Sequence, residues 1–392
     1  MRLAAWQRFE DRIFNPGRVG LYAAGLLVCY VVFLTIGYVD RLWLIDEDGS
    51  GKANDFVATW AAARLASAGQ AASAYDLAAF AHEQLLGVGK IDGYYSWAYP
   101  PTYFLLIAPL ALVPYITGAL IWLFGTLVAY AVAIRAILPR ISTALAALAS
   151  PFVLWNFSAG QNGFLTAALL GGVLVLLDRA PIAAGILLGL LTWKPQLGLL
   201  FPIILLLTGR WRAFAAAAAT TVMLAAVSYA VFGLETWAAF FAALRDQASA
   251  VLNRGAVPFQ EQQSVHALAR FLGAGDTVAW SLHLAVALTA IVFTAWLWLR
   301  PTDYRLKAAC LATATLIATP YLFIYDLPIL TVPLAFLASA GTAHGFIPGE
   351  RTAVALLAVF LLLLPAQPVG VPLLALLMLV IVLRLRKMQA AV

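Results

Sequence analysis

Continuous apolar runs of about 20 residues recur along this chain, separated by short polar or basic turns. An α-helix needs roughly this length to cross about 30 Å of hydrocarbon. The apolar positions are continuous rather than alternating, which favours membrane helices over the strands of a barrel. We therefore predict an all-α polytopic membrane protein with about 11–13 transmembrane helices, forming a single domain over residues 1–392.

Two long segments interrupt this pattern, residues 45–100 and residues 233–276. We interpret both as loops on the outer, periplasmic side. In the first loop, apolar residues at helical spacing predict short amphipathic helices on the membrane surface, over Asp55–Ala68 and Leu77–Leu86. The second loop is amphipathic in its first half.

The number of spans between Pro101 and Gly209 has two consistent solutions. Each apolar piece can cross the membrane once. Alternatively, Thr102–Val113 is re-entrant and the run Ile182–Thr208 breaks at Lys194-Pro195. The two solutions place Gln161 on opposite sides, and only the second also puts Lys194 at the outer face.

Composition and charge support a membrane protein and indicate its orientation. The chain is 64% hydrophobic and 11% charged, whereas a soluble domain carries roughly a quarter charged residues. The net charge of +6 comes from Lys and Arg that flank the spans, which marks the cytoplasmic side and predicts that both termini are cytoplasmic. This basic charge therefore indicates topology, and no nucleic-acid partner is expected. The two cysteines lie in apolar runs and the four histidines are scattered, so no structural metal site is predicted.

Asp55 is the first candidate for chemistry, because it lies just past the first span. An acid at this position can cap the following helix. However, Asn54 can supply that cap by itself, which leaves Asp55 available as a general base that takes a proton from an acceptor hydroxyl.

Lys194 is the second candidate, because a lysine within an apolar run costs about 2.5–3.5 kcal/mol on insertion scales. It can snorkel, pair with Asp178, or contact a phosphate at the break made by Pro195. Asp326 lies in an aromatic stretch that includes Tyr325. Anchoring at the membrane interface explains the tyrosines of this stretch, but it does not explain Asp326.

Three other polar groups have a structural and a functional interpretation. Gln161 and Asn162 form an ordinary interhelical turn or contact a ligand. His266 and Arg270 share one helical face, which is solvated or meets a lipid phosphate. The acidic run Asp46-Glu47-Asp48 is a solvated loop or holds a divalent ion.

Taken together, these motifs resemble glycosyltransferase family 87, from about Leu21 to Leu330. Each piece is weak alone, and their order and spacing carry the resemblance. The matching pieces are Asn54-Asp55-Phe56 with Trp60-Ala61-Ala62 and Tyr75-Asp76; Trp97-Ala98-Tyr99-Pro100-Pro101 with Pro109-Leu110-Ala111; Gly160-Gln161-Asn162 followed by Ala184-Gly185 and Lys194-Pro195; and Gln263-Ser264 with Arg270.

The resemblance implies a GT-C-type helix bundle that uses polyprenyl-phosphate sugars, often mannose, on the outer side of the membrane. It also implies that Asp55 is the catalytic base. Members of the family often carry a Ser-Trp pair and a His in the late Thr-Pro segment. Here Leu322-Phe323 and Tyr325 occupy those places, so Tyr325 would donate a hydrogen bond to phosphate instead.

Our hypothesis from the sequence is a glycosyltransferase of the bacterial inner membrane that moves a hexose to a lipid or glycolipid acceptor, with inversion. No cofactor is expected, and a divalent metal is not required because phosphate already leaves well. The alternative is a flippase or transporter of a lipid-linked sugar, without chemistry. The expected donor-binding residues are Lys194, His266, Arg270, Tyr325, Gln161 and Asn162, and the expected cavity residues are Tyr99, Gln196, Gln263 and Asp326.

Overall fold

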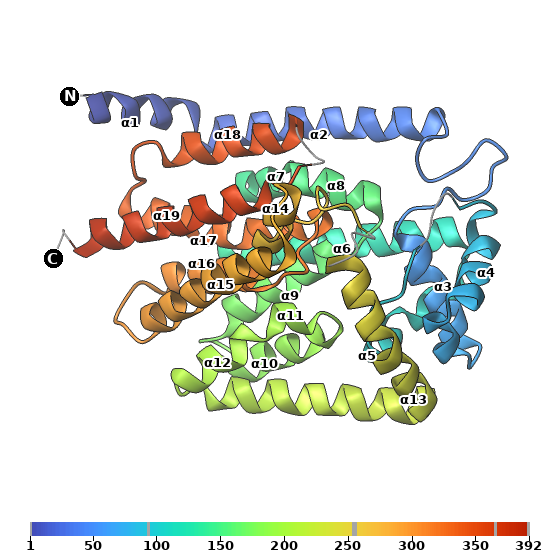
Figure 1. The fold of residues 1–392 in the computed structure, drawn as a ribbon. Coiled ribbons are helices and arrows are strands. Elements are labelled where there is room, and N and C mark those ends of the chain that lie inside the picture. Colours follow the sequence, from blue (N-terminus) through green and yellow to red (C-terminus); the bar gives the residue numbers. More distant parts are fainter. Residues whose placement is uncertain (1, 92–94, 253–256, 364–366, 390–392) are drawn as a thin grey trace.

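The computed structural model describes residues 2–389, except 92–94, 253–256 and 364–366. The described part is built from helices, which confirms the all-α prediction. Most long helices run side by side, with both termini at one end of the bundle and α3 and α4 at the other (Figure 1). The elements of the first half are α1 (Arg2–Ile13), α2 (Pro16–Val39), α3 (Phe56–Ser67), η1 (Ala71–Tyr75), α4 (Leu77–Val88), α5 (Thr102–Ile107), η2 (Ala108–Leu112), α6 (Tyr115–Ile137), α7 (Ile141–Leu148), α8 (Pro151–Ala159) and α9 (Gly163–Leu176).

The second half of the chain continues the bundle and contains several short or broken helices. Its elements are α10 (Pro181–Gly189), η3 (Leu190–Trp193), α11 (Pro195–Gly198), α12 (Leu200–Leu207), α13 (Trp211–Leu252), α14 (Val265–Phe271), α15 (Asp276–Trp298), α16 (Tyr304–Ala318), η4 (Ile324–Leu330), α17 (Thr331–His344), α18 (Glu350–Leu363) and α19 (Gly370–Gln389).

Five helical segments of the described chain are long and apolar enough to cross a membrane: α2, α6, α13, α15 and the combined η4–α17. The pair α7–α8 adds a sixth if its 51° bend is counted within one span. Four further apolar helices have only 10–17 residues. The multi-pass prediction is therefore confirmed, whereas the expected number of 11–13 spans stays a prediction.

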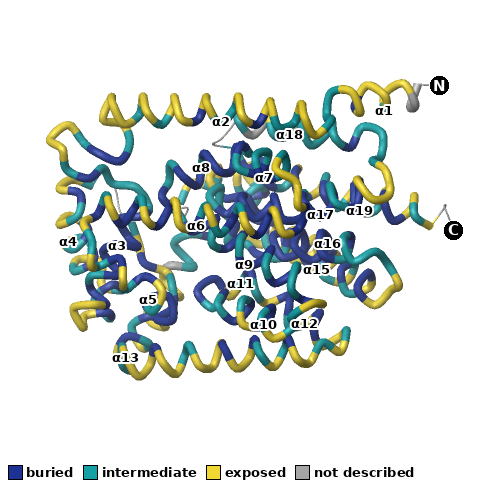
Figure 2. Tube along the Cα trace, turned by 180° about the vertical axis from the view of Figure 1, so that it is seen from behind, coloured by how far each residue is buried: buried dark blue, intermediate teal, exposed yellow. Residues whose placement is uncertain are grey.

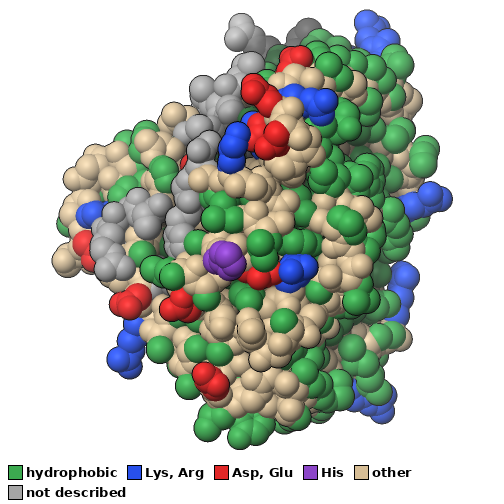
Figure 3. Space-filling view, turned by 90° about the vertical axis from the view of Figure 1, so that its right-hand side faces the viewer, with side chains coloured by type: hydrophobic (Ala, Val, Ile, Leu, Met, Phe, Trp, Pro, Cys, Tyr) green, Lys and Arg blue, Asp and Glu red, His purple; other side chains and the backbone are tan. Residues whose placement is uncertain are grey.

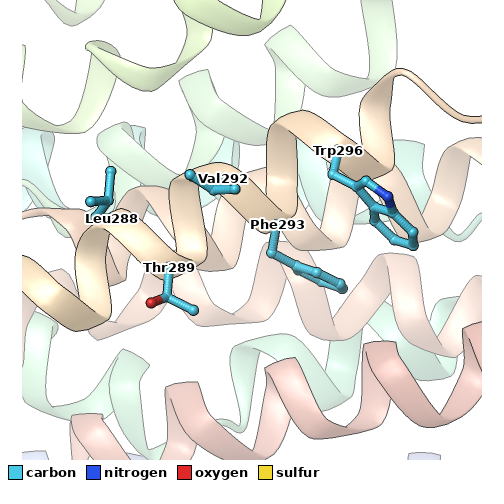
Figure 4. A pocket seen from close by; sticks show the side chains of 5 residues that line it. All are labelled: Leu288, Thr289, Val292, Phe293 and Trp296. Atoms are coloured by element: carbon cyan, nitrogen blue, oxygen red, sulfur yellow. The ribbon is translucent and has the colours of Figure 1, made fainter.

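Much of the outer surface is apolar, as expected for helices that face lipid. Exposed positions recur along the whole length of α2 and α13, at the two edges of the bundle (Figure 2), and many of them carry large apolar side chains. An open depression of about 450 Å³ runs along α15 and is lined by apolar side chains together with Thr289 (Figure 4). None of the predicted site residues lines this depression, so we interpret it as part of the lipid-facing surface.

The segment α5–η2 enters the bundle and returns to the side from which it came. Trp60 Nε1 in α3 donates to the Val113 carbonyl at 3.1 Å, just after η2 ends. Tyr115 at the start of α6 donates its hydroxyl to the Lys52 carbonyl and to Asn54 Oδ1, both at 3.0 Å. At the other end, Tyr75 in η1 donates its hydroxyl to the Tyr99 carbonyl at 2.7 Å, just before α5 begins. Both ends of α5–η2 are thus held against the first loop, as the re-entrant solution predicts.

The run from α10 to α12 breaks at Lys194. Its backbone leaves helical geometry (φ −126°, ψ 66°), and Pro195 begins α11 without an N–H to donate. The turn containing Gln161 lies beside the start of α3, because the Asp55 N–H donates to the Ala159 carbonyl at 3.0 Å. The structure therefore selects the second topological solution, in which Gln161 lies at the same end of the bundle as the first loop.

The short helices of the first loop form where predicted, but α3 is buried on nearly all sides and does not have the exposed polar face of an amphipathic surface helix. Most of its side chains are buried against η1, η2, α4 and α6. Its sequence is dominated by small alanines, which allow neighbouring helices to approach from all sides. The second predicted helix, α4, extends two residues beyond its expected end. In the second loop, α13 continues past a kink at Gly233 (φ 78°) and supplies the helical first half.

Two glycines allow the turn between α8 and α9 to pack closely on both sides. A Cβ at Gly160 would lie 2.7 Å from Asn54 Oδ1, and Gly160 also adopts a positive φ of 78°. A Cβ at Gly163 would lie only 2.0 Å from the Tyr325 carbonyl oxygen. This turn is therefore held between the start of α3 and η4.

We predict that Gly163→Ala lowers stability by about 1–3 kcal/mol, because the added methyl group must displace the backbone of η4. Gly125→Ala in α6 is the matched control, since a Cβ there meets no atom within 4 Å. Thermal melting of the purified protein in detergent measures both changes. Equal melting temperatures for the two variants would contradict the close packing described above.

Candidate active site

Asp55 is not the cap of α3, although it immediately precedes that helix. The cap is Asn54, whose Oδ1 accepts the Phe56 N–H at 3.0 Å, while the side chain of Asp55 makes no capping hydrogen bond. The interpretation of Asp55 as a helix cap is therefore wrong for its side chain. The residue as a whole is half-buried.

Tyr99, Gln161 and Asn162 form a hydrogen-bonded group beside Asp55. The Tyr99 hydroxyl accepts from Asn162 Nδ2 at 2.9 Å and donates to Gln161 Oε1 at 3.4 Å. The Asn162 backbone N–H donates to the same Gln161 oxygen at 3.2 Å. The Gln161 side chain in turn hydrogen-bonds to Asp55. Three predicted site residues are therefore brought together with the proposed base.

The surroundings of Asp55 raise the pKa of its carboxyl group to about 6. Burial is the main cause, because it disfavours the charged form, and Glu261 adds repulsion. The hydrogen bond from Gln161 and the positive charge of Lys194 oppose this rise. Asp55 is therefore ionised at neutral pH and has a pKa closer to the working pH than an ordinary aspartate, which suits a general base.

Lys194 and Asp326 form a buried ion pair. Lys194 Nζ lies 2.5 Å from Asp326 Oδ1, and the two residues are only 4% and 1% exposed. The Lys194 ammonium also lies 5.3 Å from the centre of the Tyr325 ring, a cation–π contact. The expected alternative partner, Asp178, pairs with Arg210 instead. Asp326 thus acquires a clear role as the counter-ion that makes a buried lysine tolerable.

The candidate site lies where four interruptions of the helical bundle meet. These are the start of α3, the segment before α5, the α8–α9 turn and the η3–α11 break, with η4 packed against α8 and α9. Broken helices expose polar backbone only where protein or a cavity can satisfy it. Figure 3 views this end of the bundle, where acidic, basic and apolar side chains are mixed.

His266 and Arg270 are not connected to this group by any contact among the described residues. His266 packs on Trp280 and faces Asp276 at 3.4 Å, and burial lowers the pKa of His266, which favours its neutral form. The Arg270 guanidinium lies over Phe259 and donates to the Ala274 carbonyl. The predicted shared face exists on α14, but its contacts are to its own loop and to α15.

The remaining predicted cavity residues have different positions. Gln263 is buried and bonds the backbone of Gln260, Gln367 and Gly370, so it ties the second loop to the start of α19. Gln196 is half-buried in α11, two residues beyond Lys194. Neither has a described contact with the Asp55 group.

The aspartates of the acidic run in the first loop accept hydrogen bonds from backbone N–H groups of the same loop. Asp46 Oδ1 accepts the Glu47 N–H and lies 3.8 Å from Lys52, while Asp48 Oδ1 accepts the Ser50 N–H. The residues that the structure describes contain no group of three or more metal-ligating side chains. The loop interpretation of this run therefore fits the structure better than a divalent-ion site.

Two residues that the sequence did not single out contribute to the site. Asn156 is fully buried, accepts the Gly163 N–H and donates to the Gln161 carbonyl, so it shapes the turn. Glu261 acts on the charge of Asp55 and accepts the Ile324 N–H through its carbonyl. A buried asparagine in an apolar helix, five residues before the turn, was the available signal for the first. No sequence signal distinguishes Glu261 from its polar neighbours.

Comparison with known proteins identifies the family. The model of glycosyltransferase family 87 matches residues 97–320, which is more than half of the chain. The chain belongs to glycosyltransferase family 87. It is therefore a membrane glycosyltransferase with a sugar donor and an acceptor. No curated protein and no solved structure matches it. The match includes Tyr99, Gln161 and Lys194 but begins after Asp55, so the role of Asp55 rests on the geometry described above.

We predict that Asp326→Asn lowers stability by about 3–5 kcal/mol, because it leaves Lys194 charged, buried and unpaired. The double variant Lys194→Met/Asp326→Leu should recover most of this loss. Arg210→Gln is the control, since its partner Asp178 is largely exposed and such a pair contributes roughly 0–1 kcal/mol. Thermal melting in detergent compares all three, and a double variant as unstable as the single one would contradict the ion-pair argument.

Proposed function

We propose that this protein transfers a hexose, most simply mannose, from a polyprenyl-phosphate donor to a hydroxyl group of a lipid or glycolipid acceptor. The reaction takes place on the periplasmic face of the bacterial inner membrane. The observation that carries this proposal is the Asp55 carboxylate, which is free of any capping role and lies within electrostatic reach of Lys194, where the helices are broken.

In the proposed step, Asp55 takes the proton of the acceptor hydroxyl. The hydroxyl oxygen attacks the anomeric carbon, the bond from that carbon to the phosphate oxygen breaks, and polyprenyl phosphate leaves with the bonding electrons. A single base without a covalent intermediate gives inversion at the anomeric carbon. Because the leaving group is already a phosphate, the step requires no metal ion.

Lys194 is the cation best placed to hold the donor phosphate. Its ammonium group has three N–H donors, and Asp326 accepts one of them. For the other two, no partner is described within the residues covered by the structure. An anionic phosphate oxygen bound there would add a second acceptor, with the Tyr325 ring against the same ammonium. His266 and Arg270 have no part in this proposal because their contacts lie elsewhere.

A flippase would use the same phosphate contacts without a base, so it predicts that Asp55 has no role in chemistry. Family membership supports transfer instead. The raised pKa of Asp55 also supports transfer. A carboxylate that only lines the path of a transported lipid does not need a pKa near neutrality, whereas a general base does.

We predict that Asp55→Asn lowers the transfer rate by about 10²–10⁴-fold, because the amide cannot accept the proton. The assay follows radiolabelled sugar from polyprenyl-phosphate mannose into a membrane lipid extract. Asp48→Asn is the matched control, being the same change in the same loop at a carboxylate that only bonds Ser50, and it should retain full transfer. Full transfer by Asp55→Asn would overturn the mechanism and favour the flippase.

We also predict a pH dependence with a defined sign. A base acts only when ionised, so kcat/KM should be constant well above pH 6 and fall about tenfold per unit below it. The pKa of about 6 for Asp55 places this change roughly two units above that of an ordinary aspartate. A profile measured with the same donor that stays flat down to pH 4.5 would contradict this assignment.

A further inference from the structure

The Gln161 side chain has a defined orientation, set by two donors at its oxygen. Tyr99 donates its hydroxyl hydrogen to Gln161 Oε1, because the same hydroxyl accepts from Asn162 Nδ2, a group that can only donate. The Asn162 backbone N–H is the second donor to Oε1. With the oxygen occupied in this way, the NH₂ group is the end of Gln161 that is available to Asp55. The turn holds Asp55 close, because the Asp55 N–H donates to the Ala159 carbonyl at 3.0 Å, two residues before Gln161. A hydrogen bond from Gln161 lowers the pKa of Asp55.

The turn that carries Gln161 is itself held by the fully buried Asn156. The Asn156 carbonyl accepts the N–H groups of Gly160 and Gln161, at 3.1 and 3.3 Å. Its side chain accepts the Gly163 N–H at 3.0 Å and donates to the Gln161 carbonyl at 3.3 Å. These bonds fix the backbone on both sides of Gln161, so its side chain is presented from a well-supported position.

We propose that Gln161 is a positioning residue for Asp55. Its amide holds one carboxylate oxygen and leaves the other to receive the proton of the acceptor, while Tyr99 orients that amide. This inference rests on the proposed role of Asp55 as the base. It replaces the role in holding donor phosphate that the sequence suggested for Gln161.

The position beside the Asp55 carboxylate suits a hydrogen-bond donor that carries no charge. Burial and Glu261 of the second loop disfavour the ionised form of Asp55, whereas Lys194 favours it. Tyr99, Tyr115 and Tyr325 are the other titratable groups that interact with Asp55. A further cation beside the carboxylate would stabilise it but would also attract the phosphate of the donor. An amide stabilises the carboxylate without adding charge, which keeps the phosphate at Lys194.

The test reads the protonation of Asp55 directly and needs no sugar. A hydrophobic carbodiimide modifies protonated carboxyl groups, and mass spectrometry of the Asp55 peptide from the purified full chain measures the pH midpoint of labelling. For the wild type we expect a midpoint near pH 6. Gln161→Ala should raise it by about one unit, because a charge-assisted hydrogen bond is lost.

Two near-isosteric variants separate this role from packing. Gln161→Glu keeps the oxygen acceptor but replaces the donor by a second negative charge, so it should raise the midpoint further. Tyr99→Phe removes one of the two bonds that orient the amide, and should give a smaller shift in the same direction. Gln84→Ala is the control, because it removes a buried amide whose described hydrogen bond goes to the Tyr95 carbonyl, and it should leave the midpoint unchanged.

Parallel transfer assays with polyprenyl-phosphate mannose and lipid extract separate the two proposals. An unmoved midpoint in both Gln161 variants, beside an inactive Asp55→Asn, overturns the positioning role alone. A shift in Gln84→Ala equal to that in Gln161→Ala also overturns it, since loosening of the fold then explains both. Full transfer by Asp55→Asn overturns the base assignment and, with it, the positioning role.

Discussion

The buried pair between Lys194 and Asp326 is the interaction on which the candidate site depends. Neither charge is stable alone in a low-dielectric interior, so each requires the other at contact distance. Lys194 ends one broken helix and Asp326 lies in η4, so their attraction joins two parts of the bundle that are 132 residues apart. Proline interrupts the helix on both sides of the pair, since Pro195 follows Lys194 and Pro328 lies within η4.

Around this pair, glycines decide how closely the other elements approach. Gly160 and Gly163 allow the α8–α9 turn to contact the start of α3 on one side and η4 on the other. Gln161 and Asn162 lie between these two glycines and therefore face the first loop. The same close packing removes water from Asp55, which raises its pKa. The α8–α9 turn thus affects both the packing of the start of α3 and the pKa of Asp55.

The arrangement suits a substrate that arrives from the bilayer. The exposed positions along α2 and α13 (Figure 2) include many large apolar side chains. In the reaction that we propose, a lipid-linked sugar keeps its chain in the hydrocarbon while its phosphate meets Lys194. The proposed base, Asp55, then needs to reach only the acceptor hydroxyl.

The amino-acid pattern determined the helical membrane class and the cap at Asn54, and it singled out Asp55 and Lys194 as candidates. These follow from local rules, namely the cost of charge in lipid and the hydrogen-bonding needs of a helix start. Only the tertiary structure decided that Lys194 pairs with Asp326 rather than Asp178, that α3 is buried, and that His266 faces α15 while Arg270 contacts its own loop. The physical reason is that pairing across more than a hundred residues depends on which helices pack together, and apolar helices of similar composition carry little information about their neighbours. Spacing showed that His266 and Arg270 share a face, whereas the packing of α14 determined what that face meets.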